Sequence, residues 1–127
     1  MKIIINTKSV CDGQIISETS EAKCRLFDKN GTWYVVYKEG NEFFKNTTTT
    51  IKLKGGHASV IRTGDVPGKL VIEEGKLITS AYDTGTGVLE MGISGKKVYH
   101  NLSETGGEIC LVYEIFGNEI ELMLNID

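Results

Sequence analysis

Hydrophobic and polar residues alternate along most of the chain in short runs that end at glycine-bearing turns. The runs at residues 32–37, 49–53, 109–113 and 120–126 carry the β-branched and aromatic residues that suit a half-buried pleated surface. Glycines punctuate the chain from residue 55 to residue 117 at intervals typical of a β-meander. The pattern predicts an all-β protein of about eight to ten short antiparallel strands.

Local residue types predict two of the turns. Cys11-Asp12-Gly13 separates the alternating segment that starts at Ile3 from a second extended run. Asn30-Gly31 lies between hydrophobic segments and predicts a tight hairpin, because both positions tolerate positive φ. Residues 17–23 are polar and compatible with a short helix, but no capping box supports one.

Strand number and chain length together favour a closed sheet. An open sheet would leave two exposed edges, and closure is the general way to remove them. We therefore expect residues 1–127 to form one domain, a single antiparallel up-and-down β-barrel. The interior of a barrel of about eight strands is either filled by side chains or wide enough for one small ligand.

Composition and charge limit the classes of partner. The 14 Lys and Arg residues against 17 Asp and Glu give a net charge of -3, and the arginines are Arg25 and Arg62, so we expect no nucleic acid. The apolar triplet at residues 3–5 is too short for a signal-peptide core or a membrane span. An odd number of widely spaced cysteines argues against disulfides or a zinc site. We expect a cytoplasmic protein without a metal, a cofactor or a membrane partner.

Several short motifs match a known family in their order and spacing. The motifs are Tyr37-x-Glu39, Thr50-Ile51-x-Leu53, Ile61-Arg62-x-Gly64, Tyr82-x-Thr84-x-x-Gly87-x-Leu89-x-Met91, and Gly107-x-Ile109 followed by Tyr113. Together they resemble the YwiB-like family of small uncharacterised bacterial proteins. The resemblance implies a calycin-like (lipocalin-like) barrel and no function, because that family has no established activity. This sequence has Gly85 where the family usually has proline.

Arg62 is the main candidate for a ligand contact, because it lies in an otherwise apolar strand. If it points into the barrel it must be paired, since an unpaired buried charge costs several kcal/mol. Its candidate partners are Glu90, Glu114 and an anionic ligand, so a structural ion-pair network and a ligand site both stay open. Trp33 is expected mainly as a plug in the core or at a barrel end. The full set of expected ligand-binding residues is Arg62, Tyr82, Thr84, Glu90, Tyr113, Trp33 and Tyr37.

These features give two main hypotheses of function, both non-enzymatic. The first is a barrel that binds a small amphipathic or anionic molecule in its interior or mouth, oriented by Arg62 and Tyr82. The second is a side-chain-filled barrel that acts as a protein-interaction module or forms a homodimer through an outward apolar face at Val112, Phe116 and Met123. A third, aspartic-protease-like hydrolysis through Asp83-Thr84-Gly85, is disfavoured because a single copy would require a homodimer.

Overall fold

The computed structural model describes residues 1–39, 45–83 and 87–127, and within these ranges the side chains of residues 80–83 are left out. All the regular structure in these ranges is antiparallel strand, which confirms the predicted all-β barrel, and no helix there could span a membrane. The described residues form ten strands in sequence order: β1 (Lys2–Cys11), β2 (Gln14–Lys29), β3 (Thr32–Lys38), β4 (Thr47–Lys54), β5 (His57–Gly64), β6 (Gly68–Glu73), β7 (Leu77–Asp83), β8 (Val88–Ser103), β9 (Gly106–Ile115) and β10 (Asn118–Ile126).

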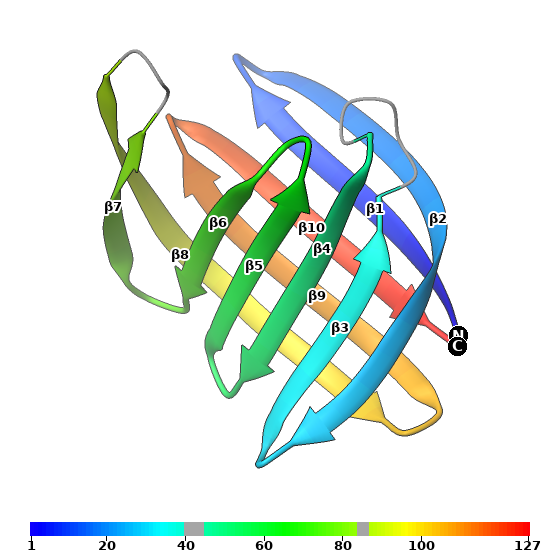
Figure 1. Ribbon diagram of the computed structural model, residues 1–127. Coiled ribbons are helices and arrows are strands. Elements are labelled where there is room, and N and C mark those ends of the chain that lie inside the picture. Colours follow the sequence, from blue (N-terminus) through cyan, green and yellow to red (C-terminus); the bar gives the residue numbers. More distant parts are fainter. Residues whose placement is uncertain (40–44, 84–86) are drawn as a thin grey trace.

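Each strand lies beside its neighbours in the sequence, and the first strand pairs with the last. The hydrogen-bonded order is β6-β5-β4-β3-β2-β1-β10-β9-β8-β7, an up-and-down arrangement (Figure 1). The β1 and β10 register runs from Ile3 opposite Ile126 to Val10 opposite Glu119. The two ends of the chain therefore lie side by side.

The Asn30-Gly31 hairpin predicted from the sequence is present between β2 and β3. Both residues have positive φ, 54° for Asn30 and 84° for Gly31, as a two-residue turn of this kind requires. The polar segment at residues 17–23 is part of β2 and not a helix. β2 pairs with β1 along residues 14–23 and with β3 along residues 24–29, so it joins the two halves of the barrel.

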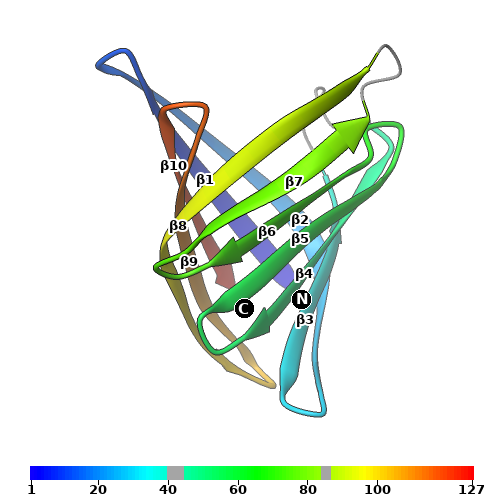
Figure 2. The same cartoon turned by 90° about the vertical axis from the view of Figure 1, so that its left-hand side faces the viewer.

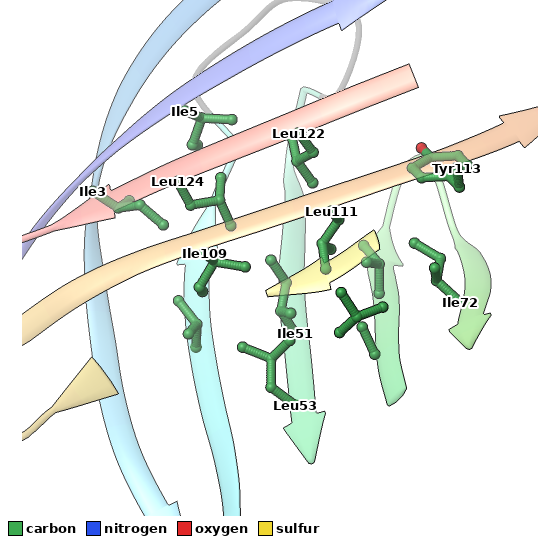
Figure 3. Packing of buried hydrophobic residues seen from close by; sticks show 14 of the residues in the cluster. Ile3, Ile5, Ile51, Leu53, Ile72, Ile109, Leu111, Tyr113, Leu122 and Leu124 are labelled. Atoms are coloured by element: carbon green, nitrogen blue, oxygen red, sulfur yellow. The ribbon is translucent and has the colours of Figure 1, made fainter. Parts of the chain in front are cut away.

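The core fills one end of the barrel with apolar side chains. Alternate residues of each strand point inward, which follows from the period of two in a pleated strand. Figure 3 shows these side chains from β1, β9 and β10 meeting those of β4 and β6. The largest fully buried apolar side chains are Ile3, Val35, Ile51, Leu53, Ile72, Ile109, Leu111 and Leu124.

The barrel has a seam between β6 and β7, the strands at the two ends of the hydrogen-bonded order (Figure 2). Next to this seam, backbone hydrogen bonds attach the turn between β6 and β7 to Gly95 on β8: the Gly95 carbonyl accepts from Gly75 N at 3.0 Å, and the Gly95 N–H donates to the carbonyl of Lys76 at 2.9 Å. A Cβ at position 95 would overlap the carbonyl of Glu73. The close approach of these two segments therefore requires glycine.

Gly95→Ala should lower the free energy of unfolding by about 1–3 kcal/mol, because the added methyl group forces Gly95 on β8 away from Glu73 at the end of β6. Gly56→Ala is the matched control, since a Cβ there meets the Glu74 side chain at an ordinary contact distance of 3.6 Å. The control should change the free energy of unfolding by less than about 0.5 kcal/mol. Urea unfolding of both variants measures the difference, and equal losses would contradict close packing at Gly95.

Candidate functional site

A cavity of about 520 Å³ lies at the end of the barrel where β1, β3, β5 and β9 end. It lies above the apolar core, where the interior positions of the strands change from aliphatic to polar residues. Part of its wall is apolar and much of the rest carries hydroxyl groups. The cavity is lined by Ile5, Thr7, Ser9, Glu18, Thr19, Ser20, Tyr37, Glu39, Arg62, Tyr113, Ile120 and Leu122.

Three adjacent strands form a row of polar residues whose two outer members, Tyr37 and Arg62, line the floor of the cavity. Tyr37 on β3 lies directly opposite Thr49 on β4, and Thr49 lies directly opposite Arg62 on β5. All three continue the inward-facing positions of their strands, because they are two residues from the buried Val35, Ile51 and Val60. The pairing register therefore brings a hydroxyl, a second hydroxyl and a guanidinium together inside the barrel.

Glu39 is the acidic partner of this row. Its backbone N–H donates to the carbonyl of Thr47 at 2.9 Å, which keeps it in line with β3 two residues beyond Tyr37. Its Oε1 accepts a hydrogen bond from Thr49 Oγ1 at 2.6 Å and lies 3.7 Å from Arg62 Nε. The Glu39 side chain is 5% exposed and the Arg62 side chain 21% exposed. The buried carboxylate thus has both a counter-charge and a hydrogen-bond donor.

Two tyrosines contribute hydroxyl groups that stay protonated. Burial raises the pKa of Tyr37 well above its usual range, the Glu39 carboxylate raises it further, and Arg62 opposes part of the shift. Burial also raises the pKa of Tyr113, again with partial opposition from Arg62. Tyr113 extends from β9 at the edge of the apolar cluster (Figure 3). Both hydroxyls can therefore donate and accept hydrogen bonds at neutral pH.

The remaining walls combine aliphatic and hydroxyl side chains. Ile5 on β1, together with Ile120 and Leu122 on β10, forms the apolar part of the cavity lining. Thr7 and Ser9 continue the lining along β1. A ligand in this cavity would meet apolar groups on one side and hydrogen-bonding groups on the other. Such a mixed lining, with a few placed polar groups, is typical of sites for small molecules.

Three of the expected ligand-binding residues meet at this cavity, namely Arg62, Tyr37 and Tyr113. Trp33 lines a different hollow of about 600 Å³ near the β2–β3 hairpin, at the other end of the barrel. Glu90 is exposed and lies next in sequence to the buried Met91, so it belongs to the outer face of β8.

Tyr82 and Thr84, two of the expected ligand-binding residues, have side chains that lie outside the described part of the structure. The backbone of Tyr82 lies on β7 opposite Leu89, while its side chain and all of Thr84 lie outside the described residues. In the Asp83-Thr84-Gly85 triplet, the Asp83 side chain and all of Thr84 and Gly85 likewise lie outside the described residues. Within the described ranges, no group of three or more His, Cys, Asp and Glu residues is placed to hold a metal ion.

The sequence analysis does not predict Glu39 or Thr49 at this site. Glu39 supplies the negative charge beside Arg62, and Thr49 donates a hydrogen bond to the Glu39 carboxylate. Glu90 and Glu114 were the acidic residues expected beside Arg62, but both are exposed. The spacing Tyr37-x-Glu39 carried a usable signal, because residues two apart on a strand face the same side. The register that brings Thr49 opposite Arg62 had no comparable signal in the sequence.

Comparisons with known proteins identify a family and a similar solved structure. The family described as "Domain of unknown function (DUF1934)" matches residues 3–125. The crystal structure of the ywiB protein from Bacillus subtilis is similar with a TM-score of 0.77, at 21% sequence identity over 99% of this chain and 90% of that chain. The likeness shows that the two chains share a fold. Among curated proteins, none matches this chain significantly.

Thr49→Val should lower the free energy of unfolding by about 1–3 kcal/mol, because the buried Glu39 carboxylate loses the hydroxyl that donates to it. Thr50→Val is the matched control. Thr50 is the next residue on β4, points to the opposite face and is half-buried. Chemical unfolding of both variants measures the difference. A Thr49→Val loss no larger than that of the control would contradict a supporting role for this hydrogen bond.

The raised tyrosine pKa values predict a loss of stability at alkaline pH. An unfolded tyrosine releases its proton near pH 10.0, whereas folded Tyr37 and Tyr113 hold theirs to higher pH. Above that pH the unfolded state binds fewer protons, so this contribution to stability is complete below pH 10.0 and decreases as the pH rises further. Tyr37→Phe should reduce the decrease between about pH 9 and about pH 11, measured by urea unfolding. An unchanged decrease would count against the burial of a protonated hydroxyl.

Proposed function

Because the chain belongs to the DUF1934 family, a domain of unknown function, we propose a function from its site: the protein binds a small amphipathic molecule in the mouth of its barrel. The supporting observation is the 520 Å³ cavity that has a polar floor and a partly apolar wall. A volume of this size suits a single small ligand. Lipocalin-like barrels also hold one ligand in the interior, and we extend that use to this barrel.

In this proposal the floor of the cavity contacts the polar part of the ligand, and the wall contacts its apolar part. Arg62 and Tyr113 orient the polar part of the ligand, since both line the cavity and carry hydrogen-bond donors. Ile5, Ile120 and Leu122 cover its apolar part. Burial of apolar surface supplies roughly 25 cal/mol per Å² of driving force, while the polar contacts select the ligand.

We propose binding without catalysis, and we place the protein in the cytoplasm. General acid–base chemistry works best with groups whose pKa lies near neutrality. Burial moves the pKa of Tyr37 and of Tyr113 away from that range. The three cysteines, Cys11, Cys24 and Cys110, are free thiols, as suits a reducing compartment.

Self-association is the second candidate function. Phe116 in the turn after β9 is 63% exposed, and Met123 on β10 is 42% exposed. Val112 is half-buried and lies opposite Glu121. Large exposed apolar side chains are typical of surfaces that meet a partner, and a homodimer through this hairpin would cover them.

Native mass spectrometry of the protein, purified gently from its own host, tests both candidates. We expect one small molecule of defined mass to co-purify in stoichiometric amount and to be lost from Arg62→Ala. Arg25→Ala is the matched control, because it removes the other arginine, which is exposed on β2. The control should retain the molecule.

Two results would count against ligand binding. A protein without a bound molecule that forms a discrete dimer would favour self-association. Loss of the molecule from both arginine variants would show that it does not depend on the cavity, since Arg25 does not line it.

A further inference from the structure

We infer that the ligand meets the floor of the cavity with an uncharged hydrogen-bonding group, such as an amide or a hydroxyl, and not with an anionic group. This inference rests on the proposed function and narrows its ligand class. A lone arginine at the mouth of a barrel suggests an anion at first sight. The arrangement around Arg62 argues against one.

The positive charge of Arg62 is already compensated inside the protein. Glu39 Oε1 lies 3.7 Å from Arg62 Nε, and the carboxylate is the more deeply buried of the two groups. Among the described residues that line the cavity, the only other charged one is Glu18, which is exposed at the rim. At the floor, one negative charge therefore balances one positive charge, and the screened rim charge of Glu18 adds no attraction for an anion. An incoming anion would gain no net attraction from this set.

An anion would also lose its hydration on entering the site. A carboxylate placed at the floor approaches Arg62 and the buried Glu39 together, so attraction to one accompanies repulsion from the other. An uncharged amide or hydroxyl loses much less hydration energy. The balance therefore favours an uncharged group, even though the two kinds of ligand can have the same shape.

The hydrogen-bonding groups of the cavity match an uncharged ligand. Tyr113, Thr7, Ser9 and Ser20 line it with hydroxyls, each of which both donates and accepts. An amide or an alcohol likewise offers a donor and an acceptor, whereas a carboxylate offers acceptors alone. A cavity lined by hydroxyls can therefore form hydrogen bonds with every polar atom of an amide or an alcohol.

Hexanamide and hexanoate test this inference, because they have the same tail and heads of nearly the same shape but differ by one charge. Hexylammonium provides the opposite charge on a similar tail. Each compound is titrated into the wild-type protein at neutral pH, and NMR signals of Tyr37, Tyr113 and the amides lining the cavity report binding. We expect hexanamide to bind roughly tenfold more tightly than hexanoate. Hexylammonium should bind more weakly than hexanamide, because its charged head loses hydration and meets the Arg62 guanidinium at the floor.

Glu39→Gln tests the cause of the preference. It removes the compensating charge but keeps a polar side chain of the same shape, so hexanoate should bind roughly tenfold more tightly than it does to the wild type. Hexanamide should bind about as before. Glu18→Gln is the matched control, because it removes a rim charge that water already screens. It should change hexanoate binding by less than about twofold.

The possible failures are distinguishable from one another. Tighter binding of hexanoate or of hexylammonium than of hexanamide at the cavity signals would overturn the uncharged-ligand inference and leave the binding function standing. No shift of those signals with any of the three compounds would overturn both. The wild-type comparison decides the inference even if Glu39→Gln does not fold.

Discussion

The pairing register of β3, β4 and β5 is the constraint on which the interior of this barrel depends. Successive residues of a strand point to opposite sides, so a shift of one residue would exchange the inner and outer positions. In the observed register the inward positions of β4 run from Leu53 and Ile51 in the core to the buried Thr49. The same register sets Tyr37 and Arg62 on either side of Thr49. One geometric relation thus positions both the apolar core and the polar floor.

The Glu39–Arg62 pair gives that floor its chemical character. The carboxylate is buried, so it needs the Thr49 hydroxyl and the guanidinium to offset its lost hydration. Because the pair neutralises itself, the ligand that we propose would be selected by shape and hydrogen bonding more than by charge. The ion-pair network and the ligand site, which the sequence left as alternatives for Arg62, are therefore compatible: the same side chain takes part in the network and lines the cavity.

The alternation of residues and the Asn30-Gly31 turn were enough to predict the all-β barrel. The family match, together with the similarity to the ywiB structure, confirms the resemblance to YwiB-like proteins. The site was predictable only in part. Trp33 shares a strand face with Tyr37, but four residues at about 3.3 Å each separate them by about 13 Å, which puts Trp33 at the other end of the barrel. Glu39 and Thr49 were missed because strand pairing, which depends on contacts distant in sequence, decides what lies beside Arg62.

The pairing of β1 with β10 has a consequence for how the chain acquires its structure. These two strands are farther apart in sequence than any other pair of neighbours, so their contact has the highest entropic cost of loop closure. During synthesis β1 can form its hairpin with β2 early, but its other edge has to wait for β10 to leave the ribosome. For most of that time the apolar residues Ile3 and Ile5 lack the neighbours that bury them in the finished barrel. The nascent chain therefore passes through a stage with an open strand edge. Such an edge can pair wrongly with another chain or be bound by a chaperone before β10 closes the barrel.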